Sequence, residues 1–165
     1  SDEFPNDTLA APALVRAGDA YLKMWRRPEL DPTYGQSAYA TYQEVLSRYP
    51  GTEPAKTADL RIKDIENRFA IKEYKAALYY IRFKALDSAI LYLRNIIATW
   101  PRAETVPDAL DKLVTAYRTL GYVEDTNETC AYFRRQWPDS PKLAVSCPES
   151  KDSVAAPAAE IKKGP

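Results

Sequence analysis

Three short segments decide the fold of this chain: RYPGT at residues 48–52, TWPRA at residues 99–103 and QWPDS at residues 136–140. In each segment an aromatic residue stands directly before a proline, at the end of a run with helical apolar spacing. Proline cannot continue a helix, so each segment marks the end of one.

The distance back to a preceding tyrosine also recurs. Tyr80 precedes Pro101 by 21 positions, and Tyr117 precedes Pro138 by 21 positions. The first unit, which starts at Tyr21, is eight residues longer. A unit that recurs at this length is typical of a helical repeat array. Each helix pair of such an array buries its apolar face against the next pair.

The apolar spacing and the positions of proline and glycine predict six helices and one short final turn. We expect the helices at about 8–25, 32–49, 55–85, 86–100, 107–120 and 123–137, and the final turn after Ser140. The stretch 55–85 is either one helix of about thirty residues or two helices with a kink near Lys72. We expect a disordered segment at 1–6, a repeat domain at 7–147 and a disordered tail at 148–165, because the tail is rich in small and charged residues.

Small residues recur at fixed distances from the tyrosine and proline landmarks. Gly18 and Ala77 come three residues before a tyrosine, and Ala38 and Ala89 come twelve residues before a proline. Small residues at these positions would let paired helices approach closely. The pattern resembles the tetratricopeptide repeat. It predicts an all-α fold, a right-handed α-solenoid of about three helix pairs.

The composition argues against an enzyme. The 165 residues include no histidine, so a histidine-based proton relay and a catalytic triad are both excluded. Two cysteines without histidine make no zinc site, and no glycine-rich phosphate loop occurs, so we expect no catalytic, metal or cofactor site. The 23 basic and 23 acidic residues balance, which predicts no nucleic-acid partner. No run of about 18 apolar residues occurs, so no membrane-spanning helix is predicted.

Several stretches together resemble the BamD (ComL) family of outer-membrane protein assembly lipoproteins. They are RPELDP at 27–32, AYATY at 38–42, EY at 73–74, YY at 79–80 and DAL at 108–110. The resemblance covers about residues 7–141 and corresponds to the C-terminal tetratricopeptide part of the family. It implies a truncated piece of a longer protein, with the last three of about five repeats. The family's lipid anchor, on an N-terminal cysteine, would lie outside this chain.

The resemblance also implies a function and a location. The expected role is a protein-binding scaffold of the outer-membrane β-barrel assembly machine, at the periplasmic face of the outer membrane of a Gram-negative bacterium. The expected partners are the periplasmic POTRA part of the barrel subunit, BamA, and small accessory lipoproteins. The alternative is another periplasmic tetratricopeptide adaptor, such as a cell-division or envelope coordinator. One departure is that the family often has Arg-Gly where this chain has Phe83 and Lys84.

Four residues are the expected partner-binding set: Tyr79, Arg82, Phe83 and Arg118. An exposed aromatic beside an arginine is a frequent pairing at interface hot spots. Alternatively, Phe83 packs under the next helix and Arg82 is simply solvated. Weaker candidates, each with a structural or solvated alternative, are Tyr74, Tyr80, Tyr92, Arg26, Arg27, Arg134, Arg135, Glu104 and Asp108.

The two cysteines suggest a covalent link near the C-terminus. Cys130 falls at a core position of the last repeat, and Cys147 lies just beyond it. A periplasmic setting and an even cysteine count favour a disulfide between them, which would hold the terminal segment against the last helix pair. The alternative is two buried or free thiols.

Overall fold

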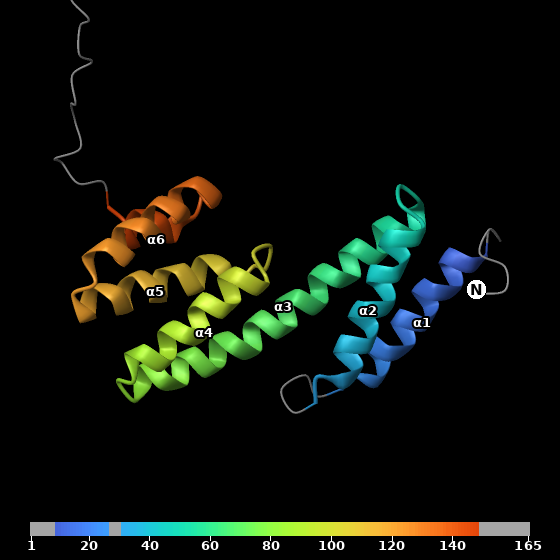
Figure 1. The fold of residues 1–165 in the computed structure, drawn as a ribbon, viewed down its shortest axis with the longest axis horizontal. Helices are drawn as coiled ribbons and strands as arrows, with labels where there is room; N and C mark the ends of the chain where they lie inside the picture. Colours follow the sequence, from blue (N-terminus) through green and yellow to red (C-terminus); the bar gives the residue numbers. More distant parts are fainter. Residues whose placement is uncertain (1–8, 27–30, 149–165) are drawn as a thin grey trace, which may run out of the picture.

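The computed structural model describes residues 9–26 and 31–148. These residues form helices and no strand (Figure 1). The helices are α1 (Ala10–Met24), α2 (Thr33–Arg48), α3 (Glu53–Arg82), α4 (Leu86–Thr99), α5 (Val106–Leu120), α6 (Val123–Gln136) and α7 (Pro141–Ser146). The all-α repeat fold and the one-helix interpretation of the long central stretch are therefore confirmed.

Helix α3 is the axis of the molecule. Thr52 caps its start, since its hydroxyl oxygen accepts a hydrogen bond from the Ala55 N–H at 3.3 Å. Pro54 occupies the first turn, where proline is tolerated. No proline or glycine follows within the helix, so it continues unbroken for 30 residues to Arg82.

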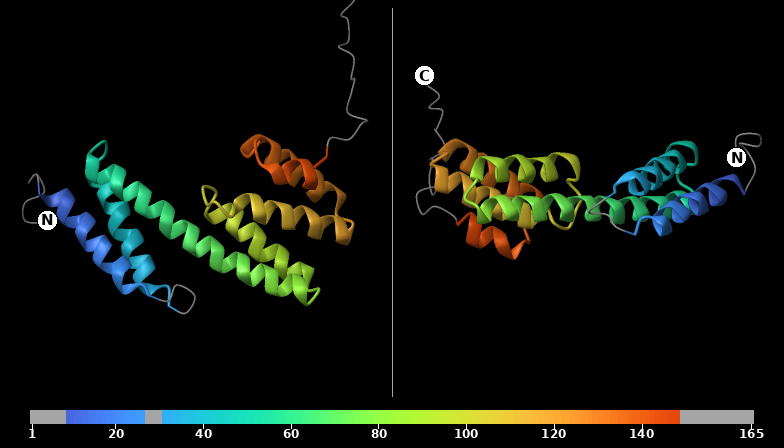
Figure 2. Two further views of the ribbon diagram at one scale, coloured as in Figure 1. Left: turned by 180° about the vertical axis from the view of Figure 1, so that it is seen from behind. Right: turned by 90° about the horizontal axis from the view of Figure 1, so that it is seen from below.

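The other helices pack on opposite sides of this axis. Helices α1 and α2 form an antiparallel pair beside the N-terminal half of α3, and α4 packs beside its C-terminal half on the other side (Figure 1). Helix α5 then packs on α4, and α6 packs on α5. The second view shows an elongated molecule (Figure 2). Three helix pairs result, α1/α2, α3/α4 and α5/α6. The right-handed sense of the solenoid and the domain boundaries stay predictions. The segments 1–6 and 148–165 lie outside the described residues, apart from Pro148.

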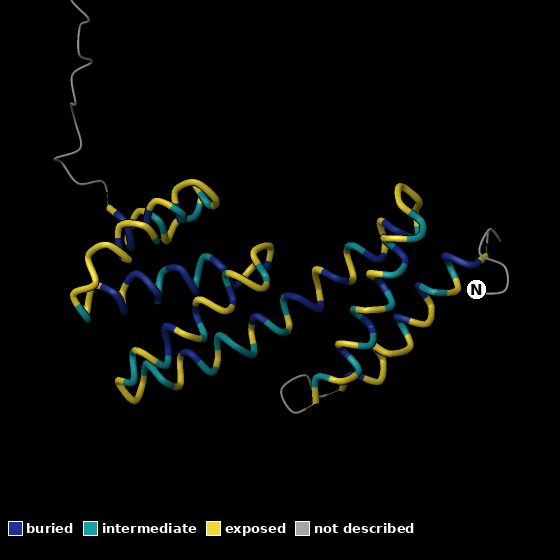
Figure 3. The backbone as a smooth tube through the Cα atoms, viewed as in Figure 1, coloured by how far each residue is buried: buried dark blue, intermediate teal, exposed yellow. Residues whose placement is uncertain are grey.

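The described residues form two hydrophobic cores, and α3 contributes to both (Figure 3). Ile62 and Ile65 belong to the core shared with α1 and α2, and Ala77 belongs to the core shared with α4 and α5. Phe69 lies at the junction. Its ring centroid is 5.0 Å from that of Trp25 and 5.9 Å from that of Trp100. One aromatic side chain of α3 therefore connects the two halves.

The four small residues lie where the sequence predicted close approach. Ala38, Ala77 and Ala89 are fully buried. A Cβ atom at Gly18 would lie 2.5 Å from a ring atom of Tyr42, so only glycine fits there without movement. The predicted packing register is confirmed at these positions.

Two residues at the edges of the apolar helical stripes are exposed. Tyr21 is 38% exposed, because α1 is an outer helix of the described structure and packs mainly on α2. Leu60 is 66% exposed on the N-terminal half of α3. A helical stripe wider than the neighbouring helix leaves its edge uncovered, which explains both exposures.

The helix ends follow the sequence with small shifts. Asp31 Oδ1 accepts a hydrogen bond from the Thr33 N–H at 2.9 Å, so this carboxylate stabilises the start of α2. Gly121 ends α5 with φ at +77°, as predicted for a glycine after a helix. From the sequence, Asp7 or Thr8 can cap the first helix, and both residues lie outside the described part of the chain.

Helix α7 is fixed to the last repeat by covalent and polar contacts. In the structure Cys130 and Cys147 form a disulfide, with their Cα atoms 5.6 Å apart. Ser146 Oγ donates a hydrogen bond to Asp111 Oδ1 at 2.6 Å. Burial alone would raise the pKa of Asp111, but the hydrogen bonds from Ser146 and Lys112 outweigh it and lower that pKa. The terminal segment therefore packs as part of the fold.

Candidate protein-binding surface

Four aromatic rings form a row over the end of α3 and the adjoining face of α4. The ring centroids of Phe83 and Tyr79 are 4.7 Å apart, those of Tyr79 and Tyr80 are 5.6 Å apart, and those of Tyr80 and Tyr92 are 5.3 Å apart. A hydrogen bond with Tyr80 raises the pKa of Tyr92. We call these four residues the aromatic row.

The outer end of the aromatic row is exposed. Tyr79 is 58% exposed and Phe83 is 62% exposed. Arg82 is also exposed, between them along the helix. The alternative interpretation, in which Phe83 packs under the next helix, is therefore wrong for this side chain. Exposed aromatic side chains next to an arginine are the composition that protein interfaces favour at their centres.

The exposed apolar surface extends further along α3 than the sequence analysis proposed. Ile71 is 44% exposed and Leu78 is 39% exposed. Both share a helix side with Arg82, since residues 71, 78 and 82 are spaced by seven and four. Their helical spacing was visible in the sequence. The sequence did not show which of the apolar residues of α3 would stay exposed after α4 had packed against the helix.

Arg118 lies at the exposed end of α5 and lines a different hollow. That hollow also contains Tyr122 and Val123, which are 45% and 67% exposed. The structure thus groups Tyr79, Arg82 and Phe83 and places Arg118 beside other apolar neighbours. The predicted binding set falls on two surfaces.

The weaker candidates have structural neighbours. Tyr74 packs against the C-terminal core, apart from the aromatic row, and burial raises its pKa. Asp108 pairs with Lys142 at 2.5 Å, and Glu104 lies 3.8 Å from Lys63. These acids are therefore engaged within the molecule.

Of the remaining arginine candidates, two contact other groups of the protein and one is exposed. Arg134 donates a hydrogen bond to the Cys147 carbonyl at 2.9 Å, and the Arg135 guanidinium lies 5.9 Å from the centroid of the Tyr132 ring. Arg26 is exposed, and Arg27 lies outside the described residues. Arg134 is thus a structural residue that holds the end of α7.

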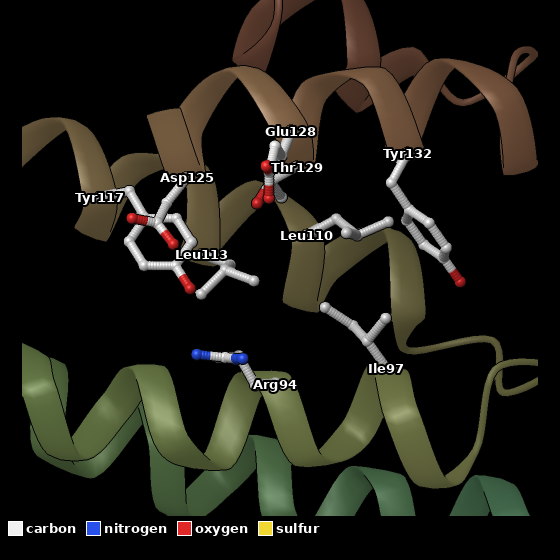
Figure 4. Close-up of a pocket in the computed structure, with 9 residues that line it drawn as sticks. All are labelled: Arg94, Ile97, Leu110, Leu113, Tyr117, Asp125, Glu128, Thr129 and Tyr132. Atoms are coloured by element: carbon white, nitrogen blue, oxygen red, sulfur yellow. The ribbon is translucent and has the colours of Figure 1, made fainter. Parts of the chain in front are cut away.

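A small polar hollow of about 230 Å³ lies between α4, α5 and α6 (Figure 4). Arg94 points into it from α4, and Asp125 and Glu128 face it from α6 (Figure 4). Burial raises the pKa of Tyr117 at its inner end, and the nearby Arg94 counteracts that rise. The hollow therefore contains one cation, Arg94, and two carboxylates, Asp125 and Glu128, so charges of both signs face each other within the fold.

The described residues contain no cluster suited to metal chemistry. Among residues 9–26 and 31–148, no three histidine, cysteine, aspartate or glutamate side chains come together in a way that could hold a metal ion. Within the same ranges, no helix combines the length and apolar character needed to cross a membrane.

Stacked helix pairs define this chain as a helical-repeat protein. Comparison with known families is more specific. The model of the family described as "Outer membrane lipoprotein" (YfiO) matches residues 3–132, and the chain belongs to that family.

Similar proteins include three named "Outer membrane protein assembly factor BamD". The protein from Vibrio cholerae is 29% identical over 103 residues, which are 62% of this chain and 43% of that protein. The protein from Caulobacter vibrioides is 27% identical over 135 residues, covering 82% of this chain and 44% of the relative. The protein from Xylella fastidiosa strain 9a5c is 30% identical over 114 residues, covering 69% and 39%. The chain spans less than half the length of these relatives.

Proposed function

We propose that this chain is a protein-binding part of an outer-membrane β-barrel assembly factor. It acts without enzymatic chemistry, at the periplasmic face of the outer membrane of a Gram-negative bacterium. Its partners are the periplasmic POTRA part of a BamA-type barrel subunit and small accessory lipoproteins. The observation that carries the proposal is the family match over residues 3–132.

The surface supports a docking role for the end of α3. Tyr79 and Phe83 present adjacent exposed rings, and Arg82 adds a cation beside them. Rings of this kind bury a large area at a low cost in conformational entropy, since each has two rotatable side-chain bonds. Arginine can pair with a carboxylate in two parallel hydrogen bonds. A partner that offers an apolar pocket next to an acidic residue would fit this end of the helix.

Two further features bear on the location and on the alternative. The Cys130–Cys147 disulfide fits an oxidising compartment such as the periplasm. A different periplasmic tetratricopeptide adaptor would share the helix pairs. The family match favours the assembly factor over such an adaptor.

Direct binding to the POTRA domains of the cognate barrel subunit tests the proposal. The double variant Arg82→Glu, Phe83→Ala should weaken this binding at least tenfold, about 1.4 kcal/mol, with unchanged helicity. The matched control is Lys56→Glu, Leu60→Ala. It reverses one cation and removes one exposed apolar side chain on the other half of the same helix.

The outcomes separate the possibilities. Wild-type affinity in the Arg82/Phe83 variant would place the docking site elsewhere on the molecule. Equal losses in both variants would indicate a general charge effect and contradict a specific site. If the unmodified chain binds no POTRA domain, the adaptor alternative is favoured.

A further inference from the structure

A groove of about 520 Å³ lies between the end of α3, the start of α4 and α5. Ile81, Leu86 and Ala116 supply aliphatic lining. Two lysines, Lys84 and Lys112, also line the groove. At 100° per residue, Ile81 lies about 200° around α3 from Tyr79, so the groove and the aromatic row occupy opposite sides of that helix.

The groove has few hydrogen-bond donors left for a ligand apart from its lysines. Thr115 and Thr119 also line it, but their hydroxyls donate to the carbonyl oxygens of residues 111 and 115, at 2.9 and 2.8 Å. Lys112 has one acidic neighbour, Asp111, at 3.1 Å. No ion pair engages Lys84 within residues 9–26 and 31–148. Cationic donors favour a ligand with anionic oxygens, and in a protein segment these are carboxylates.

The backbone at Lys84 is unusual. Its φ is +59°, the one positive value at a non-glycine residue in the described ranges. The Lys84 N–H donates to the Ile81 carbonyl and the Ala85 N–H donates to the Tyr80 carbonyl, both at 3.0 Å, which is the Schellman motif. The same motif ends α5, and there the left-handed position is Gly121. The left-handed conformation is unfavourable for lysine and unstrained for glycine. Lys84 therefore places a cation beside the groove at a cost in backbone strain.

We propose that this groove binds an acidic segment of a partner protein, anchored by an aliphatic side chain between α3 and α5. The aliphatic anchor occupies the lining formed by Ile81, Leu86 and Ala116, and flanking carboxylates pair with Lys84 and Lys112. The volume is within the range of pockets that enclose a few side chains. This binding site is separate from the aromatic row and does not depend on the proposed assembly function.

Three short peptides test the stated chemistry on the full chain by fluorescence anisotropy. The first has the core Glu-Glu-Leu-Leu-Glu-Glu, the second replaces each glutamate with lysine, and the third replaces both leucines with serine. We expect the first peptide to bind at least tenfold more tightly than either control. Its affinity should fall as salt rises, because the ion pairs are at the surface.

Variants of the groove locate the binding. Lys84→Glu, Lys112→Glu should weaken the first peptide at least tenfold, and the Lys56→Glu variant on the other half of α3 should leave its affinity unchanged. Lys84→Gly should weaken binding several-fold and also raise the melting temperature, since it removes the charge and relieves the left-handed backbone. A lysine with a purely structural role would show no loss of peptide affinity in that variant.

Several results would overturn the proposal. They are equal affinity for the lysine peptide, wild-type affinity in Lys84→Glu, Lys112→Glu, and no measurable binding of the first peptide to the unmodified chain. The charge-reversed chain should also sediment like the wild type. A changed sedimentation coefficient would indicate that a second copy, or residues 149–165 of the same chain, occupies the groove in place of a partner.

Discussion

The substitution Gly18→Ala is a sharp test of the packing between α1 and α2. The added Cβ would lie 2.5, 2.7 and 3.0 Å from three atoms of the Tyr42 ring. That ring is fully buried, and its hydroxyl donates to Asp19 Oδ1 at 2.7 Å. Asp19 is in turn 3.2 Å from Arg61 on α3. The ring is therefore held at both ends and has little room to move.

Two opposing effects set the magnitude. Alanine favours a helix over glycine by about 1 kcal/mol. Overpacking a buried site costs about 1–3 kcal/mol, and contacts under 3.0 Å with a fixed ring place this site at or above the upper end. We therefore expect a net loss of about 2 kcal/mol in the free energy of unfolding. For a chain of this size, that loss lowers the melting temperature by roughly 4–8 °C.

Urea unfolding followed by circular dichroism measures the change. The double variant Gly18→Ala, Tyr42→Leu is the control, because a smaller side chain opposite the new methyl should recover part of the loss relative to Tyr42→Leu alone. A Gly18→Ala variant as stable as the wild type, or more stable, would refute the inferred close approach of the two helices.

Three further predictions concern stability. Cys147→Ser should lower the free energy of unfolding by about 3 kcal/mol in the chain-entropy model. Peptide mass spectrometry without reduction should show Cys130 linked to Cys147. Two alkylatable thiols in the oxidised protein would contradict the link. Ala89→Leu should destabilise the fully buried α3/α4 contact by roughly 1–3 kcal/mol, and unchanged melting would show that this contact is loose. Burial and the hydrogen bond to Asp19 raise the pKa of Tyr42, so its contribution to stability is complete below about pH 10 and declines above that pH. Tyr42→Phe should flatten this alkaline decline in urea unfolding between pH 8 and pH 11, and an unaltered decline would assign it to other groups.

The candidate site was only partly predictable. Tyr79, Arg82 and Phe83 follow from the sequence because adjacent residues near the end of one helix stay neighbours in any packing. Arg118 was grouped with them by residue type, and the structure places it beside Tyr122 and Val123. The groove between α3 and α5 was missed, since its two lysines are 28 positions apart in the sequence.

The sequence by itself determined the local features of this protein. Helix ends follow from proline, glycine and capping residues, which act over one or two turns. The absence of histidine excluded an imidazole-based site, and the small residues marked the close contacts, because both conclusions need only residue identity and spacing.

Only the tertiary structure decided how these elements share α3. Phe69 contacts Trp25 on one side and Trp100 on the other. The sequence of α3 does not show that either tryptophan is its neighbour. Tyr21 and Leu60 belong to apolar stripes yet remain exposed, because burial depends on which neighbouring helix covers a stripe. Coverage is a non-local property, set by the packing of segments that lie far apart along the chain.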